Sequence, residues 1–190
     1  MSTISLPLLT LKPPNAGWWP MHIDWQEERY TEWPSCVLRD PFIEMVVWLE
    51  AILMDALPAV WQVNIEEIQW PILAEKAGPE TIHLTLYGKM LGAGFQFDLD
   101  RRNEYSTLAS GTVSARQLAG IWFESLSQAI SRNDFVAPEE WDNDLRRLDT
   151  SRLRALLAGQ PIDDTWRPDY IDEKARWDRS VKLARQVIFG

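Results

Sequence analysis

The spacing of apolar residues changes twice between positions 42 and 130, and this change restricts the folds open to the chain. From 42 to 57 apolar residues recur every three or four positions, as they do along one face of a helix. From 61 to 99 they alternate with polar residues, as in strands with one buried face, and helical spacing returns after Ser114. Short strands between two helices predict an α+β fold, with an antiparallel β-meander of about four to six strands and helices packed on one face.

Capping residues mark where both helices begin. Asp40 is a favoured N-cap residue, and Pro41 at the first helical position gives up no hydrogen bond that a helix needs. Ser114 and Gln117 have the spacing of a capping box, in which two side chains satisfy free backbone donors. We therefore expect two helices with apolar stripes packed on the sheet. The stripes are Phe42, Met45, Val46, Leu49, Ile52 and Leu53 in the first helix, and Leu118, Ile121, Trp122, Leu126 and Ala129 in the second.

The strands are predicted from alternation and from the turn residues between them. We expect an edge strand or extended arm over 3–11 and a second strand over 21–33. Pro71 lacks a backbone N–H, so its strand is expected at an edge or a bulge. The strands of the meander are expected at 61–65, 68–72, 82–86 and 95–99.

The chain is expected to divide after residue 135. Residues 1–135 are predicted to form the α+β core domain, and 136–190 a helical C-terminal extension packed on the core. An alternative is that this extension serves as a contact arm. Helical spacing in the extension occurs at 138–148, 151–158 and 169–189.

Negative charge is concentrated in the first half of the chain. The net charge is −9, of which residues 1–95 contribute −7 and residues 96–190 contribute −2. Binding to a nucleic-acid backbone needs a concentrated basic face, so nucleic acid is excluded as a partner. A basic protein partner is permitted, because complementary charge speeds encounter. The alternative is that the acidic surface only keeps the protein soluble.

Several features of the sequence favour a cytoplasmic protein. Residues 1–7 lack the basic and apolar regions of a signal peptide. The most apolar stretch is interrupted by Glu44, Glu50 and Asp55, so no membrane span is expected. The single cysteine, Cys36, cannot form an internal disulfide, which fits a reducing compartment.

The residue types that carry most enzyme chemistry are scarce. His22 and His83 are the only histidines and do not form a metal-binding motif with each other, so no cofactor or metal is predicted. No nucleophile motif of the Gly-x-Ser-x-Gly type is present. We therefore expect a protein without enzymatic activity. Asp98 and Asp100 carry the alternative, a carboxylate or metal-dependent enzyme with an Asp-x-Asp cation site, although both acids are expected on the solvated end of a strand.

Ten of the eleven tryptophans divide into two groups by their surroundings. One group lies on the predicted apolar stripes and is expected in the core: Trp48, Trp61, Trp70, Trp122 and Trp177. The other group lies in polar or turn-like sequence: Trp18, Trp19, Trp25, Trp33 and Trp166. Because tryptophan is enriched among binding hot spots, this second group is expected to mark an interface or else to cover the open end of the sheet.

A small, acidic, aromatic-rich α+β protein without a catalytic set resembles, at the level of type, bacterial immunity proteins that neutralise a partner toxin. This resemblance implies a module that covers a basic bacterial toxin or effector with an acidic, tryptophan-rich surface. A third possibility is a homo-oligomeric assembly subunit, such as a homodimer built through the tryptophans and the helix Asp169–Phe189. The predicted contact surface of the binding module is Trp18, Trp19, Asp24, Trp25, Glu27, Glu28 and Trp33.

Overall fold

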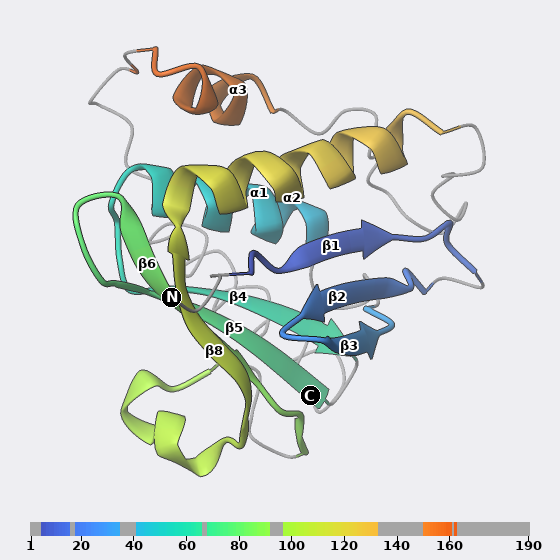
Figure 1. Cartoon of the computed structure of the whole chain (residues 1–190). Helices are drawn as coiled ribbons and strands as arrows, with labels where there is room; N and C mark the ends of the chain where they lie inside the picture. Colours follow the sequence, from blue (N-terminus) through green and yellow to red (C-terminus); the bar gives the residue numbers. More distant parts are fainter. Residues whose placement is uncertain are drawn as a thin grey trace, which may run out of the picture.

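The strands of the chain form two antiparallel sheets that share one hydrophobic core (Figure 1). The computed structural model describes residues 5–15, 18–34, 41–65, 68–91, 97–132, 150–160 and 162. The first sheet has the order β1-β2-β3 and consists of β1 (Leu8–Leu11), β2 (Met21–Trp25) and β3 (Glu28–Glu32). The segment 21–33, expected to be one strand, is therefore a hairpin of two strands.

The second sheet has five strands and follows the order β4-β5-β6-β8, with the short β7 paired to β5. All of its pairings are antiparallel, and the helices pack against it, so the predicted α+β fold is confirmed. Its strands are β4 (Ala59–Ile65), β5 (Ile68–Lys76), β6 (Thr81–Tyr87), β7 (Met90–Leu91) and β8 (Thr107–Ser114).

Three helices lie together on one side of the molecule: α1 (Pro41–Leu53), α2 (Ala115–Ile130) and α3 (Ser151–Leu157) (Figure 1). The predicted cap of the second helix is confirmed, because the Ser114 hydroxyl accepts a hydrogen bond from the Gln117 N–H at 3.4 Å. No helix in the described part of the chain is both long enough and apolar enough to cross a membrane.

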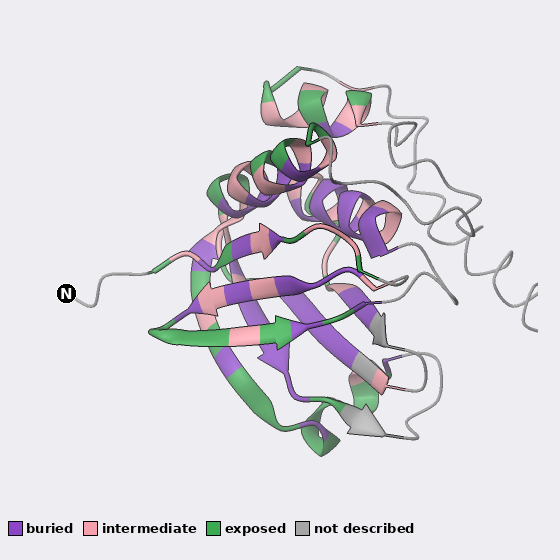
Figure 2. Cartoon of the chain, turned by 90° about the vertical axis from the view of Figure 1, so that its right-hand side faces the viewer, coloured by how far each residue is buried: buried purple, intermediate pink, exposed green. Residues whose placement is uncertain are grey.

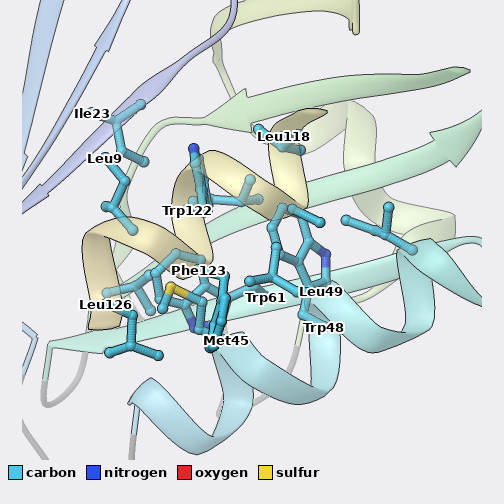
Figure 3. Close-up of a cluster of buried hydrophobic side chains, with 14 of the residues drawn as sticks. Leu9, Ile23, Met45, Trp48, Leu49, Trp61, Leu118, Trp122, Phe123 and Leu126 are labelled. Atoms are coloured by element: carbon cyan, nitrogen blue, oxygen red, sulfur yellow. The ribbon is translucent and has the colours of Figure 1, made fainter. Parts of the chain in front are cut away.

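Three tryptophan rings occupy the centre of the core, where α1, α2 and β4 meet (Figure 3). The ring centroids of Trp48 and Trp122 are 5.4 Å apart, and those of Trp61 and Trp122 are 5.7 Å apart. Each indole N–H donates to a backbone carbonyl: Trp48 to Ala59, Trp61 to Pro41 and Trp122 to Pro7. Trp70 is also buried, so these four core predictions are confirmed, whereas Trp177 lies outside the described residues.

Helix α3 is fixed to the other two helices by several kinds of contact. Leu153 is buried in the main core, and the Arg152 guanidinium lies 3.7 Å from the carboxylate of the buried Glu50 on α1. Arg116 on α2 donates to the carbonyls of Leu156 and Leu157, at the C-terminal end of α3. This segment therefore packs on the helical layer. The boundary expected after residue 135 and the helices expected at 138–148 and 169–189 lie outside the described residues.

Two local predictions are wrong. Residues 97–99 were expected in a strand, but Phe97 and Asp98 precede a 3-10 helix, η1 (Leu99–Glu104). Pro71 was expected at an edge or a bulge, but β5 lies between β4 and β6. The missing N–H of Pro71 is tolerated because β5 changes partner there: β7 pairs as far as Gln69, and β6 pairs from Ile72.

A smaller cluster of aromatic residues covers part of the sheet face that the helices leave open. Tyr87, Phe97 and Tyr105 pack together around Leu73, with the Phe97 and Tyr105 ring centroids 4.8 Å apart. The apolar residues before and after η1 therefore form this second cluster instead of extending the sheet.

The tryptophan centre predicts a large difference between buried and exposed indoles. Trp122→Ala is expected to lower the free energy of unfolding by about 3–5 kcal/mol, because it leaves a cavity and frees the Pro7 carbonyl. Trp33→Ala, at a tryptophan that is 45% exposed, is the matched control and is expected to cost less than about 1 kcal/mol. Urea unfolding of both variants measures the difference, and equal losses would contradict the central role of Trp122.

Candidate functional site

The structure separates the four tryptophans that were predicted to contact a partner. Trp33 is 45% exposed and Trp18 is half-buried, but Trp19 and Trp25 are only 1% and 3% exposed. The expectation that Trp19 and Trp25 are exposed anchors is therefore wrong, because both belong to the main hydrophobic core. Trp19 packs edge-on against Phe42 with centroids 4.9 Å apart, and the Trp25 indole N–H donates to the Ser5 carbonyl.

The remaining predicted residues lie on or beside the β2–β3 hairpin. Asp24 is on β2, Glu27 is in the turn, Glu28 begins β3, and Trp33 follows its last residue. Figure 2 shows β3 as a largely exposed strand at the outside of the first sheet, with the hairpin turn projecting at one end. The hairpin therefore brings the three predicted acids close together and places Trp33 at the far end of β3.

Asp24 differs from the other two acids because a cation of the same sheet neutralises it. The Arg29 guanidinium forms two hydrogen bonds to the Asp24 carboxylate, at 2.6 and 2.8 Å. These hydrogen bonds hold the pKa of Asp24 below its usual value. The acidic character of the surface therefore comes mainly from Glu27 and Glu28, which are both exposed.

The hairpin turn has an unusual backbone for its residues. Gln26 and Glu27 have φ angles of 53° and 70°, so both lie in the left-handed region. Two-residue hairpin turns with this geometry are normally built from Asn and Gly, because a Cβ atom makes the conformation costly. A strained turn persists only where its surroundings hold it in place.

Two side chains supply this support by fastening the hairpin to the edge of the second sheet. The Gln26 amide donates to the Ser110 carbonyl at 2.7 Å, and the Tyr30 hydroxyl donates to the Leu108 carbonyl at 3.2 Å. The ring of Trp25 lies close to Gly111, where an added Cβ would come within 3.3 Å of the indole. The position of Glu27 and Glu28 is thus set by contacts between two sheets.

Sequence reasoning missed Gln26, Tyr30 and Leu108, although a pattern pointed to the first two. Apolar residues occupy odd positions from Met21 to Trp25, and the next aromatic residue is at even position 30. Such a change of phase is expected where a two-residue turn separates two strands. Leu108 lies beside this hairpin and is 42% exposed. It belongs to β8, where apolar and polar residues alternate too weakly for a strand to be predicted from the sequence.

An ion pair between a buried acid and an exposed lysine lies at the opposite end of β3. The Glu32 side chain is only 7% exposed, and its carboxylate lies 3.0 Å from the ammonium of Lys89, in the connection between β6 and β7. Burial raises the pKa of Glu32, and the hydrogen bond from Lys89 opposes this rise. The pair links the two sheets at the end of β3 away from the turn.

The structure gives Asp98 and Asp100 a different setting from the one expected. Asp98 is the N-cap of η1, and its carboxylate accepts a hydrogen bond from the Asp100 N–H at 2.9 Å. The neighbouring arginines bind other acids, Arg101 to Glu104 and Arg102 to Glu75. Among the residues that the structure describes, no group of three or more His, Cys, Asp or Glu side chains could hold a metal ion.

The strained turn predicts opposite effects for two neighbouring substitutions. Glu27→Gly is expected to raise the free energy of unfolding by roughly 0.5–1 kcal/mol, because glycine adopts a positive φ without steric cost. Glu28→Gly removes an identical acid from an extended position and is expected to lower stability by about 0.5–1 kcal/mol. Thermal and urea unfolding test the pair, and the same sign for both would argue against strain at Glu27.

The Glu32 environment predicts a specific pH dependence. Folding raises the pKa of Glu32, so the folded protein binds this proton more tightly than the unfolded chain does. The free energy of unfolding therefore falls as the pH rises through the pKa of Glu32 in the folded protein. Glu32→Gln is therefore expected to gain stability relative to the original chain between about pH 4 and pH 7. Urea midpoints at both pH values measure this gain. The variant Lys89→Met is expected to lose more stability than the original chain as the pH rises, because it lacks the cation that favours ionised Glu32.

Comparison with known proteins gives little further information. No protein-family model matches the sequence, and no curated protein is similar to it. One chain of a solved structure described as the CdiA-CT/CdiI toxin and immunity complex from Enterobacter cloacae is similar to 64% of this chain and 99% of its own length. The two chains are 8% identical with a TM-score of 0.42, a likeness too low to support an argument about fold or function.

Proposed function

We propose that this chain is an immunity-type binding protein without enzymatic activity, which neutralises a basic bacterial toxin or effector in the cytoplasm. The observation that carries the proposal is the presentation of Glu27 and Glu28 on a strained hairpin tip held by hydrogen bonds to β8. Turn strain is found where the surrounding structure sustains it, often at functional positions. Here the strained geometry projects two acids into solvent at one end of β3, and the exposed Trp33 follows the other end of that strand.

The charge of the chain supports a cationic partner over an anionic one. The net charge is −9, and the two acids at the hairpin tip have no cation bound to them among the interactions of the described residues, in contrast to Asp24. Complementary charge raises the association rate and disfavours wrong partners. Trp33, exposed at the other end of β3, supplies the large apolar side chain that interfaces commonly use as an anchor.

The proposal is tested by charge reversal at the hairpin with a matched reversal elsewhere. The double variant Glu27→Lys/Glu28→Lys is expected to lose a basic protein that the original chain retains from its source lysate, because the contact becomes repulsive. The control Glu80→Lys/Glu124→Lys changes the net charge by the same amount at two other exposed acids, in the β5–β6 turn and on α2. Affinity capture with mass spectrometry compares the three proteins.

Equal loss in both double variants would show that net charge alone matters and would contradict a surface at the hairpin. Neutralisation requires a second measurement. The captured protein, expressed alone, is expected to arrest growth of its host, and co-expression of this chain is expected to restore it. Growth unaffected by the captured protein would contradict the immunity-type function.

A further inference from the structure

The two sheets have four outer edges, and three of them make contacts with a helix or with the other sheet. Helix α2 packs along β1, and its Trp122 donates to the Pro7 carbonyl just before that strand. On β4 the Ala59 carbonyl accepts from Trp48, and on β8 the carbonyls of Leu108 and Ser110 accept from Tyr30 and Gln26. Covering edges in this way prevents unwanted strand pairing.

The fourth edge belongs to β3 and is open in the described part of the chain. There β3 pairs with β2 and with no other strand. Its residues Glu28, Arg29 and Thr31 are exposed, and no backbone hydrogen bond leaves the strand on its outer side among the described residues. An uncovered strand of this kind is a template on which another extended chain can pair.

The hairpin geometry identifies the backbone groups that point outward. In a two-residue turn of this type the flanking residues, Trp25 and Glu28, exchange hydrogen bonds across the hairpin. Hydrogen-bonded and non-hydrogen-bonded pairs then alternate along an antiparallel ladder. The Asp24–Arg29 and His22–Thr31 pairs are therefore non-hydrogen-bonded pairs. The backbone N–H and C=O groups of Arg29 and Thr31 consequently point away from β2, toward the open edge.

We propose that an extended segment of the basic partner adds to the outer edge of β3 as a fourth strand of the first sheet. This inference rests on the proposed function and specifies how the partner binds. Main-chain hydrogen bonds at Arg29 and Thr31 supply pairing, while side chains at the two ends select the segment. Lysine or arginine residues lie beside Glu27 and Glu28 at one end, and an apolar residue contacts Trp33 at the other.

Charge distinguishes this occupant from a second copy of the chain. Antiparallel pairing of two β3 strands, with Arg29 of each copy opposite Thr31 of the other, also places Glu28 opposite Glu32. Like charges directly opposite each other destabilise a sheet, and each copy carries a net charge of −9. A cationic strand of another protein removes both conflicts.

The experiment uses the full chain and a synthetic peptide of alternating lysine and valine as the probe. A peptide of about seven residues spans β3 at roughly 3.3 Å per residue. Amide exchange measured by NMR is expected to slow at least about tenfold at Arg29 and Thr31 when the peptide is saturating, with β1 unchanged. No slowing at these two amides overturns the proposal.

A pair of variants separates backbone pairing from side-chain contact. Thr31→Pro removes the outward N–H and is expected to weaken peptide binding about tenfold, whereas Thr31→Val keeps it and stays within about twofold. Both variants lose the same hydroxyl hydrogen bond, to the His22 ring. Equal affinities in the two variants overturn strand addition, and if Thr31→Pro does not fold, the amide exchange of the original chain decides.

Further readouts keep this inference distinct from the proposed function. One outcome is that the peptide fails to bind Glu27→Lys/Glu28→Lys but binds the two Thr31 variants equally well. This outcome overturns strand addition and leaves an acidic docking surface in place. Peptide pairing at β3 with no toxic partner captured overturns the immunity-type function instead. Sedimentation of the chain alone tests whether β3 pairs with the β3 strand of a second copy. If the chain self-associates and Thr31→Pro abolishes this self-association, the edge belongs to a homodimer and the proposal is overturned.

Discussion

Three indole rings meet between the helices and the second sheet, and each ties a different segment of backbone to the core. Trp48 holds the start of β4, Trp61 holds the start of α1, and Trp122 holds the residue before β1. Such rings fill the core with large apolar area and also satisfy backbone carbonyls that would otherwise be buried without a donor. The relative placement of helices, first sheet and second sheet therefore depends on this cluster.

The position of the first sheet decides which strands stay accessible. Its inner residues, including Leu9 and Ile23, belong to the common core, and its hairpin turn reaches the edge of β8 through Gln26. One side of the hairpin is thereby used for internal contacts, so β3 is left on the outside with the acidic turn at one end. The same contacts that protect the edge of β8 leave the edge of β3 open.

Much of the fold could be predicted because its helices and inner strands follow simple periodicities and have clear caps, as at Ser114. Long-range contacts decided the remainder. Trp19 and Trp25 are surrounded by polar neighbours in sequence, and their burial depends on Phe42 and Gly111, which lie far along the chain. The turn at Gln26–Glu27 contains neither glycine nor asparagine, so local rules gave no indication of it. At the candidate site the acids were recognisable by type, whereas the open edge of β3 is a property of the assembled sheets.

The hydrogen bond from Trp122 to Pro7 spans 115 positions of sequence, and this span bears on the order of events during synthesis. Because the ribosome delivers the N-terminus first, β1 to β3 emerge well before the helix that anchors them. Until α2 has been added, the first sheet lacks the helix that packs along β1 and the Trp122 indole that donates to the Pro7 carbonyl. The β3 edge proposed for partner binding is therefore expected to take its final position only after α2 has been synthesised, so the acidic N-terminal half alone does not present it.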